Sequence, residues 1–308
     1  MKLVTSSEFT RHFSSDLALR VRVFSAKGLY PKGVLATERG LYVATEDIVF
    51  TVVEGKPYDQ VESKFPYSEM AWASPQEVRF WSSIILCEDG DGPKILFYPK
   101  HIEAGVLQSK DIDLRDTSNQ MLITSLVREG IGPEENFDRG QFSIFDTEVN
   151  LERQPEFYSR ISETDHILLR GMTCLIKCDM LSRYHEFAEE ATIVAFIALD
   201  ASFALVSSLL RKSGISNPSA SDAGKWLDDT FNRPMGIDPG ERRYFEEIYE
   251  QRILTMHPGS RFGECPFAPL MLDDLFDLRR DLREIFAYLV TGMHGPEFER
   301  RRSARASW

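Results

Sequence analysis

The stretch YHEFAEEATIVAFIALDASFALVSSLLRK, residues 184–212, decides the fold of the second half of the chain. It is apolar nearly all round, and as a helix it is long enough to cross a membrane. However, Asp200 lies near its middle together with several serines, and a carboxylate at the centre of a bilayer is costly. We therefore interpret the stretch as the central helix of a soluble bundle, and we expect no membrane association.

Other segments with helical periodicity surround this stretch. We predict long helices at residues 166–181, 241–257 and 269–292, with a short helix around residues 225–232. Apolar residues at helical spacing mark the buried side of the last helix: Leu275, Leu278, Leu282, Ile285 and Leu289. The sum is an all-α antiparallel bundle of four long helices with one short insert.

The first half of the chain has the periodicity of strands. Residues 17–24 alternate between apolar and polar side chains, and residues 40–53 are rich in β-branched and aromatic residues. Residues 78–87 and 94–100 flank the turn-forming sequence EDGDGP, which predicts a hairpin. The predicted fold class is therefore α+β, with a mixed strand-rich accessory or sensing domain at 1–155 and a helical bundle at 156–308. The first domain offers no chemical motif, and the sequence does not identify its partner.

The formal net charge of −12 argues against non-specific adhesion to nucleic acids or to anionic membranes. A site for RNA would therefore have to be local. The basic C-terminal tail, residues 298–308, is one candidate patch, but the usual behaviour of chain ends favours a solvated and disordered terminus there. The arginines at 279, 280 and 283 could extend a basic track for RNA, but they alternate with acidic residues, which favours a salt-bridged face in solvent.

The four cysteines are too few and too scattered for a disulfide framework, so we expect a reducing cytoplasm. The first residues contain no apolar core of signal-peptide length, and secretion is not expected. Cys174 and Cys178 lie four apart on a predicted helix, which would be half of a metal site. Because no second pair of ligands completes it, we interpret them as packed thiols, and we expect neither a metal nor another cofactor.

The sequence QRILTMHPG, residues 251–259, carries the one pattern with chemical meaning. On the helix predicted at 241–257, Arg252 falls near the centre of an apolar stripe formed by Phe245, Ile248, Tyr249, Ile253 and Met256. An unpaired charge buried there would cost about 3–5 kcal/mol. Arg252 must therefore find an acidic partner inside the protein or face a cleft where an anion binds.

His257 follows Arg252 after five positions and precedes Pro258. A residue before proline is disfavoured in the helical conformation, so the helix should end at His257 and the imidazole can turn towards the arginine. An arginine neutralises a phosphate with fixed geometry, and a histidine moves a proton near neutral pH. Together they would form a site that handles phosphate.

Arg252 and His257 could instead have purely structural roles. Arg252 could pair with Asp200, which is the lone acid of its apolar stretch, or with Glu189 or Glu190. His257 could cap the end of its helix, because an imidazolium interacts favourably with the helix dipole there.

The Arg-x4-His pattern near the end of the penultimate helix resembles the HEPN (higher eukaryotes and prokaryotes nucleotide-binding) superfamily. The resemblance covers roughly residues 160–292 and rests on Arg252, His257 and Pro258. It implies a metal-independent endoribonuclease that acts as a homodimer. Our hypothesis for the whole chain is a role in stress or phage defence, with a first domain that senses a trigger or restrains the nuclease. Arg252 would hold the scissile phosphate, and His257 would act as general base or acid while the ribose 2′-hydroxyl attacks phosphorus. RNA would be the substrate because that hydroxyl is the nucleophile.

One position departs from the pattern of the active members of this superfamily. They usually carry a polar residue directly after the arginine, and this chain has Ile253 there. Isoleucine can neither hydrogen-bond a phosphate nor orient an imidazole. The alternative is therefore a non-catalytic dimerisation or nucleotide-binding module that works as an adaptor.

Overall fold

The computed structural model has an α+β fold, as the sequence predicts, and it divides into two compact units. The sheet unit comprises Met1–Ile85 and Pro93–Tyr158, and the helical unit comprises Leu86–Gly92 and Ser159–Trp308. The chain thus passes finally into the helical unit at residue 159, where the sequence prediction placed the boundary at 156. The structure describes residues 3–4, 18–55, 73–88, 95–107, 112–131, 149–237, 247–248, 252–253, 256 and 272–306.

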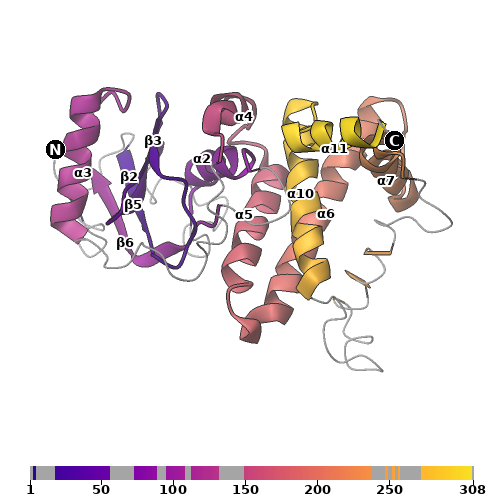
Figure 1. Ribbon diagram of the computed structural model, residues 1–308, viewed down its shortest axis with the longest axis horizontal. Helices are drawn as coiled ribbons and strands as arrows, with labels where there is room; N and C mark the ends of the chain where they lie inside the picture. Colours follow the sequence, from indigo (N-terminus) through magenta and orange to yellow (C-terminus); the bar gives the residue numbers. More distant parts are fainter. Residues whose placement is uncertain are drawn as a thin grey trace. The chain divides into compact units, whose positions relative to one another are not determined.

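The sheet unit is built on six antiparallel strands in the order β1-β6-β2-β5-β4-β3 (Figure 1). The strands are β1 (Leu3–Val4), β2 (Ala18–Phe24), β3 (Gly33–Ala36), β4 (Gly40–Ala44), β5 (Val49–Gly55) and β6 (Pro99–Leu107). Strands β2 and β5 lie in the middle of the sheet, so the alternating segment predicted at 17–24 is a central strand.

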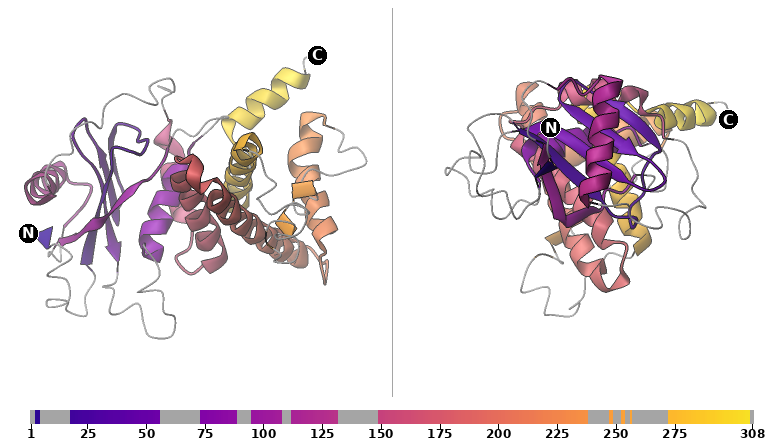
Figure 2. Two further views of the ribbon diagram at one scale, coloured as in Figure 1. Left: turned by 90° about the horizontal axis from the view of Figure 1, so that it is seen from below. Right: turned by 90° about the vertical axis from the view of Figure 1, so that its left-hand side faces the viewer.

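A helix covers each face of this sheet (Figure 2). Helix α3 (Thr117–Ile131) packs Ile123 and Val127 against the face that carries Val21 and Val23. Because successive side chains of a strand point to opposite faces, Arg20 and Arg22, which alternate with these valines along β2, point to the other face. There they meet helix α2 (Pro75–Ile85).

The hairpin predicted from residues 78–87 and 94–100 was wrong, because residues 78–85 lie in helix α2. Pro75 is the first residue of the helix, where a missing N–H is harmless. Ser74 and Glu77 form a reciprocal cap: the Glu77 N–H donates to the Ser74 hydroxyl at 3.3 Å, and the Ser74 N–H donates to the Glu77 carboxylate at 2.8 Å. The strand prediction was wrong because it followed the β-branched and aromatic residues of this segment, which favour strands, and the turn-forming sequence after it. Val78, Trp81 and Ile85 in fact recur at helical spacing.

The helical unit contains the long helices that the sequence predicts in its described part. They are α5 (His166–Leu181), α6 (Ala188–Lys212) and α10 (Leu272–Thr291), and they lie side by side in Figure 1. The shorter helices α7 (Ala220–Leu227) and α11 (Pro296–Ala306) accompany them. Helix α4 (Gln154–Arg160) begins in the sheet unit, which ends at Tyr158, and finishes in the helical unit. Helix α11 occupies the tail for which the sequence favoured a disordered end, so that expectation was wrong.

The three long helices are in close contact. A Cβ atom at Gly171 of α5 would lie 2.6 Å from the Phe286 ring of α10 and 3.0 Å from the Ala201 side chain of α6. The predicted apolar side of α10 is confirmed at Leu275, Leu278, Leu282 and Ile285, which are buried.

Helix α6 is the core helix of this unit. Within the described part of the chain, the stretch His185–Lys212 alone has the length and apolar composition to cross a membrane. Half of its most apolar window is buried inside the protein, between α5, α7 and α10. The central helix of a soluble bundle has this burial, and a single stretch of this kind is weak evidence for a membrane span.

Candidate functional site

The helical unit brings Arg252 and Asp200 together. Asp200 lies in the middle of α6, and a terminal nitrogen of the Arg252 guanidinium (Nη2) donates to the Asp200 carboxylate at 2.6 Å. The Arg252 side chain is 22% exposed and that of Asp200 is 36% exposed, so solvent reaches the ion pair. The sequence offered Asp200, Glu189 and Glu190 as possible partners for Arg252, and the structure shows the pair with Asp200.

The described residues between 241 and 257 are all helical, which agrees with the helix predicted there. Ile248 is buried, and Arg252 and Met256 follow it at spacings of four residues on the same side of the helix. Ile253 is 37% exposed, so its placement in the apolar stripe was wrong. The reason is its position one residue, or about 100°, beyond Arg252. His257, Pro258, Phe245 and Tyr249 lie outside the described residues.

The ion pair limits what Arg252 can do chemically. The carboxylate neutralises the charge of the guanidinium, which weakens its attraction for a phosphate. At the same time a carboxylate fixes the orientation of the guanidinium that it binds. The pair can therefore stabilise the packing of its helix on α6, or it can orient an arginine for a ligand.

The arginines of α10 do not form the solvent face that the sequence predicted. Arg279 and Arg283 are buried, and both bind the carboxylate of Glu88 at 3.2 and 3.3 Å. Arg279 also donates to both carboxylate oxygens of Asp179 on α5. Burial alone would lower the pKa of Arg279, but these two carboxylates raise it above its ordinary value. A signal was present in the sequence, because Arg279 and Arg283 follow Leu275 at spacings of four residues on the buried side.

Arg280 alone of these three arginines fits the prediction of a salt-bridged outer face. It binds Asp277 at 2.8 Å and Asp281 at 3.1 Å, and its side chain is 22% exposed.

The basic tail is also paired with acidic groups. On α11, Arg300 binds Glu297, Arg302 binds Glu299 at 2.6 Å, and Arg301 reaches Glu284 of α10 at 2.7 Å. Arg305 donates to the backbone carbonyl of Met235 at 3.1 Å. The tail is therefore a helix that Arg301 and Arg305 attach to other segments of the unit, and its positive charge is largely balanced.

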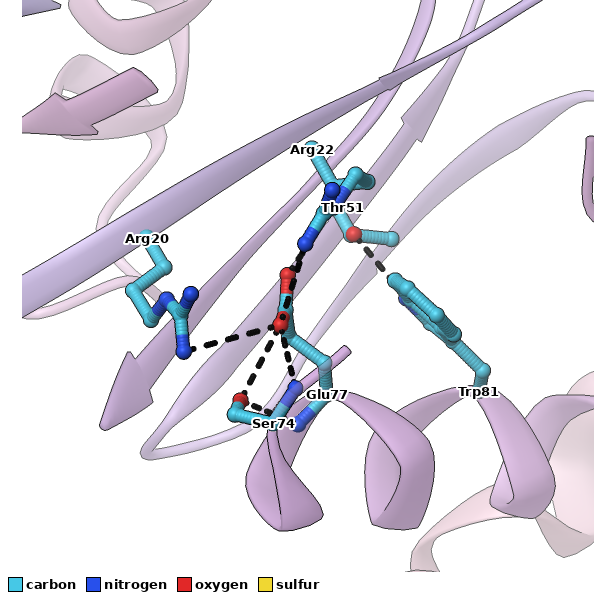
Figure 3. Close-up of polar contacts among 6 residues, drawn as sticks. All are labelled: Arg20, Arg22, Thr51, Ser74, Glu77 and Trp81. Carbon is cyan, nitrogen blue, oxygen red and sulfur yellow. Dashed lines mark hydrogen bonds and ion pairs between the residues drawn. The ribbon is translucent and has the colours of Figure 1, made fainter. Parts of the chain in front are cut away.

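A buried polar cluster in the sheet unit was missed by the sequence reasoning (Figure 3). Arg22 of β2 donates to both oxygens of Glu77 at 3.2 and 3.4 Å, and Arg20 lies 3.7 Å from the same carboxylate. Burial by itself raises the pKa of Glu77, but Arg22, Arg20 and the backbone N–H of Ser74 together lower it to about 2. Two arginines spaced two apart on a strand share one face, and this spacing was the available signal. The cluster fastens α2 to the sheet.

The described residues include no group of three or more His, Cys, Asp or Glu side chains that could hold a metal ion. Cys174 and Cys178 are buried, and burial raises the pKa of Cys178 to about 12. A thiol of that kind is unreactive at neutral pH. The two residues are packed in the core, and Cys265 lies outside the described residues.

Comparisons with models of protein families, with curated proteins and with solved structures found no match for this chain.

Proposed function

We propose that the helical unit is a non-catalytic HEPN-like module that joins two copies of this chain and acts as a cytoplasmic adaptor. The observation that supports the absence of catalysis is the ion pair between Arg252 and Asp200 within one chain, whereas the joining of two copies rests on the resemblance to HEPN proteins. An arginine that serves a phosphate offers its charge to the ligand, whereas this charge is balanced by the carboxylate on α6.

The surroundings of Arg252 support the same proposal. Ile253 occupies the position where active HEPN proteins usually carry a polar residue, and it is exposed and apolar. Arg279 and Arg283 are used inside the core, and the tail arginines bind glutamates. Together with the net charge of −12, these pairs leave little positive field for RNA in the described part of the helical unit.

The second candidate is the metal-independent endoribonuclease of stress or phage defence. The observation that favours it is the partial exposure of the ion pair, because a phosphate can approach a guanidinium that is 22% exposed. Asp200 would then orient Arg252, which would stabilise the charge on the phosphate. His257 would transfer the proton as the 2′-hydroxyl attacks, and the sheet unit would sense a trigger.

An RNA assay separates the two candidates. The purified full chain would be incubated with total RNA in EDTA, beside the variants Arg252→Ala and His257→Ala. Arg233→Ala is the matched control, because Arg233 forms an exposed ion pair with Asp229 in the same unit. We expect intact RNA in every sample. Cleavage by the wild type and by Arg233→Ala that both other variants abolish would overturn the proposal and establish the nuclease.

The adaptor proposal also has a positive test. Light scattering on the purified protein should give a mass about twice the 35.3 kDa of one chain. A mass of one chain across the micromolar range would contradict a module that joins two copies.

A further inference from the structure

The segment Leu86–Glu88 belongs to the helical unit although it lies in the first third of the sequence. It follows directly after Ile85, which is the last residue of α2 in the sheet unit. Leu86, Cys87 and Glu88 are all buried. The chain thus leaves the sheet unit, inserts a short segment into the helical unit, and returns.

Glu88 supplies a charge that the core of the helical unit requires. Its side chain is fully buried, and its carboxylate binds Arg279 at 3.2 Å and Arg283 at 3.3 Å. Asp179 of α5 provides the second carboxylate of this group. Two guanidinium groups therefore face two carboxylates, and the removal of Glu88 would leave α10 with an excess positive charge in the core.

The position of Glu88 depends on α2 through the covalent chain. Glu77 binds Arg22 of β2, and the indole N–H of Trp81 donates to the Thr51 hydroxyl of β5 at 3.1 Å, so α2 is fixed to the sheet (Figure 3). Glu88 is three residues beyond the end of α2. Three residues span roughly 10 Å when fully extended, so the segment has little slack.

We propose that Leu86–Glu88 is a conformational link through which the sheet unit controls the packing of α10. When α2 shifts on its sheet, Glu88 is withdrawn from Arg279 and Arg283, and α10 loosens against α5. The link gives the sheet unit a route to the helical unit, and it does not depend on whether the helical unit cuts RNA.

Hydrogen exchange of the full chain tests the first half of this proposal. In Glu88→Gln, which keeps the shape of the side chain and removes its charge, the amides of α5 and α10 should exchange on the order of tenfold faster. The amides in the strands of the sheet unit should exchange at the same rate as in the wild type. Should Glu88→Gln fail to fold, Glu88→Asp keeps the charge on a shorter side chain and serves in its place. Unchanged exchange in α10 would overturn the proposal.

A pair of substitutions in the sheet unit tests the link itself. Trp81→Phe removes the bond from α2 to β5, whereas Val127→Ala weakens α3 on the opposite face of the sheet. Trp81→Phe should speed exchange in α10, and the effect should vanish when Glu88→Gln is already present. Val127→Ala should leave α10 unchanged. Equal effects of the two substitutions on α10, or an effect of Trp81→Phe that persists without the Glu88 charge, would contradict the link.

Discussion

Arg252, Glu77 and Glu88 are charged residues whose roles depend on the partner that each one meets. Asp200 was available to the sequence analysis as a partner for Arg252, because each is an isolated charge among apolar neighbours. The partners of Glu77 and Glu88 could not be predicted from the sequence, because Arg22 is 55 positions from Glu77 and Arg279 is 191 positions from Glu88. Pairs so distant in sequence require the tertiary fold, which a single sequence does not supply.

Glu77 should make the stability of the sheet unit depend on pH. Its pKa falls from the ordinary 4.5 to about 2 on folding, so its contribution is present above pH 4.5 and is lost as the pH falls towards 2. The difference corresponds to about 3 kcal/mol. Urea unfolding of Glu77→Gln should show lower stability at neutral pH and a shallower fall in this range than the wild type.

The control for this measurement is Glu54→Gln, which alters a carboxylate of β5 that pairs with Arg39 at the surface. It should keep the acid dependence of the wild type. If Glu77→Gln loses stability with pH as steeply as the wild type does, the buried cluster is not the source of the effect.

The helices differ in how clearly the sequence marks them. Helices α5 and α10 were predicted close to their observed bounds, because their apolar residues recur on one side. Helix α2 was mistaken for a strand although Val78, Trp81 and Ile85 recur at helical spacing, because its β-branched and aromatic residues are typical of strands. Capping residues gave a second signal that the prediction did not use, at Ser74 and also at Asp165.

Asp165 caps the start of α5, where its carboxylate accepts the N–H of Leu168 at 3.1 Å. Asp165→Ala should lower the free energy of unfolding of the helical unit by about 1 kcal/mol, because an N–H at the helix start loses its partner. Asp165→Asn caps comparably and should cost much less. Thermal unfolding followed by circular dichroism measures both, and equal losses in the two variants would show that the cap contributes nothing specific.

At the scale of the whole molecule, the α+β class follows from the two periodicities in the sequence, and the structure has that class. That the segment Leu86–Gly92 belongs to the helical unit could not be predicted, because Leu86 and Cys87 directly continue the apolar sequence of α2. The molecule is therefore two units joined by more than one passage of the chain. The proposal of a module that does not cut RNA rests separately on the Arg252–Asp200 pair, on Ile253 and on the paired arginines of the helical unit.

A double-mutant cycle on that pair tests the central claim most directly. Wild type, Asp200→Ala, Arg252→Ala and the double variant would be unfolded in denaturant, beside the same cycle on the exposed pair of Asp229 and Arg233. We predict a coupling energy of about 1 kcal/mol for Asp200 and Arg252 and a smaller one for the exposed pair. A coupling no larger than that of the exposed pair would show that Asp200 does not hold Arg252, and would contradict a structural role for the arginine.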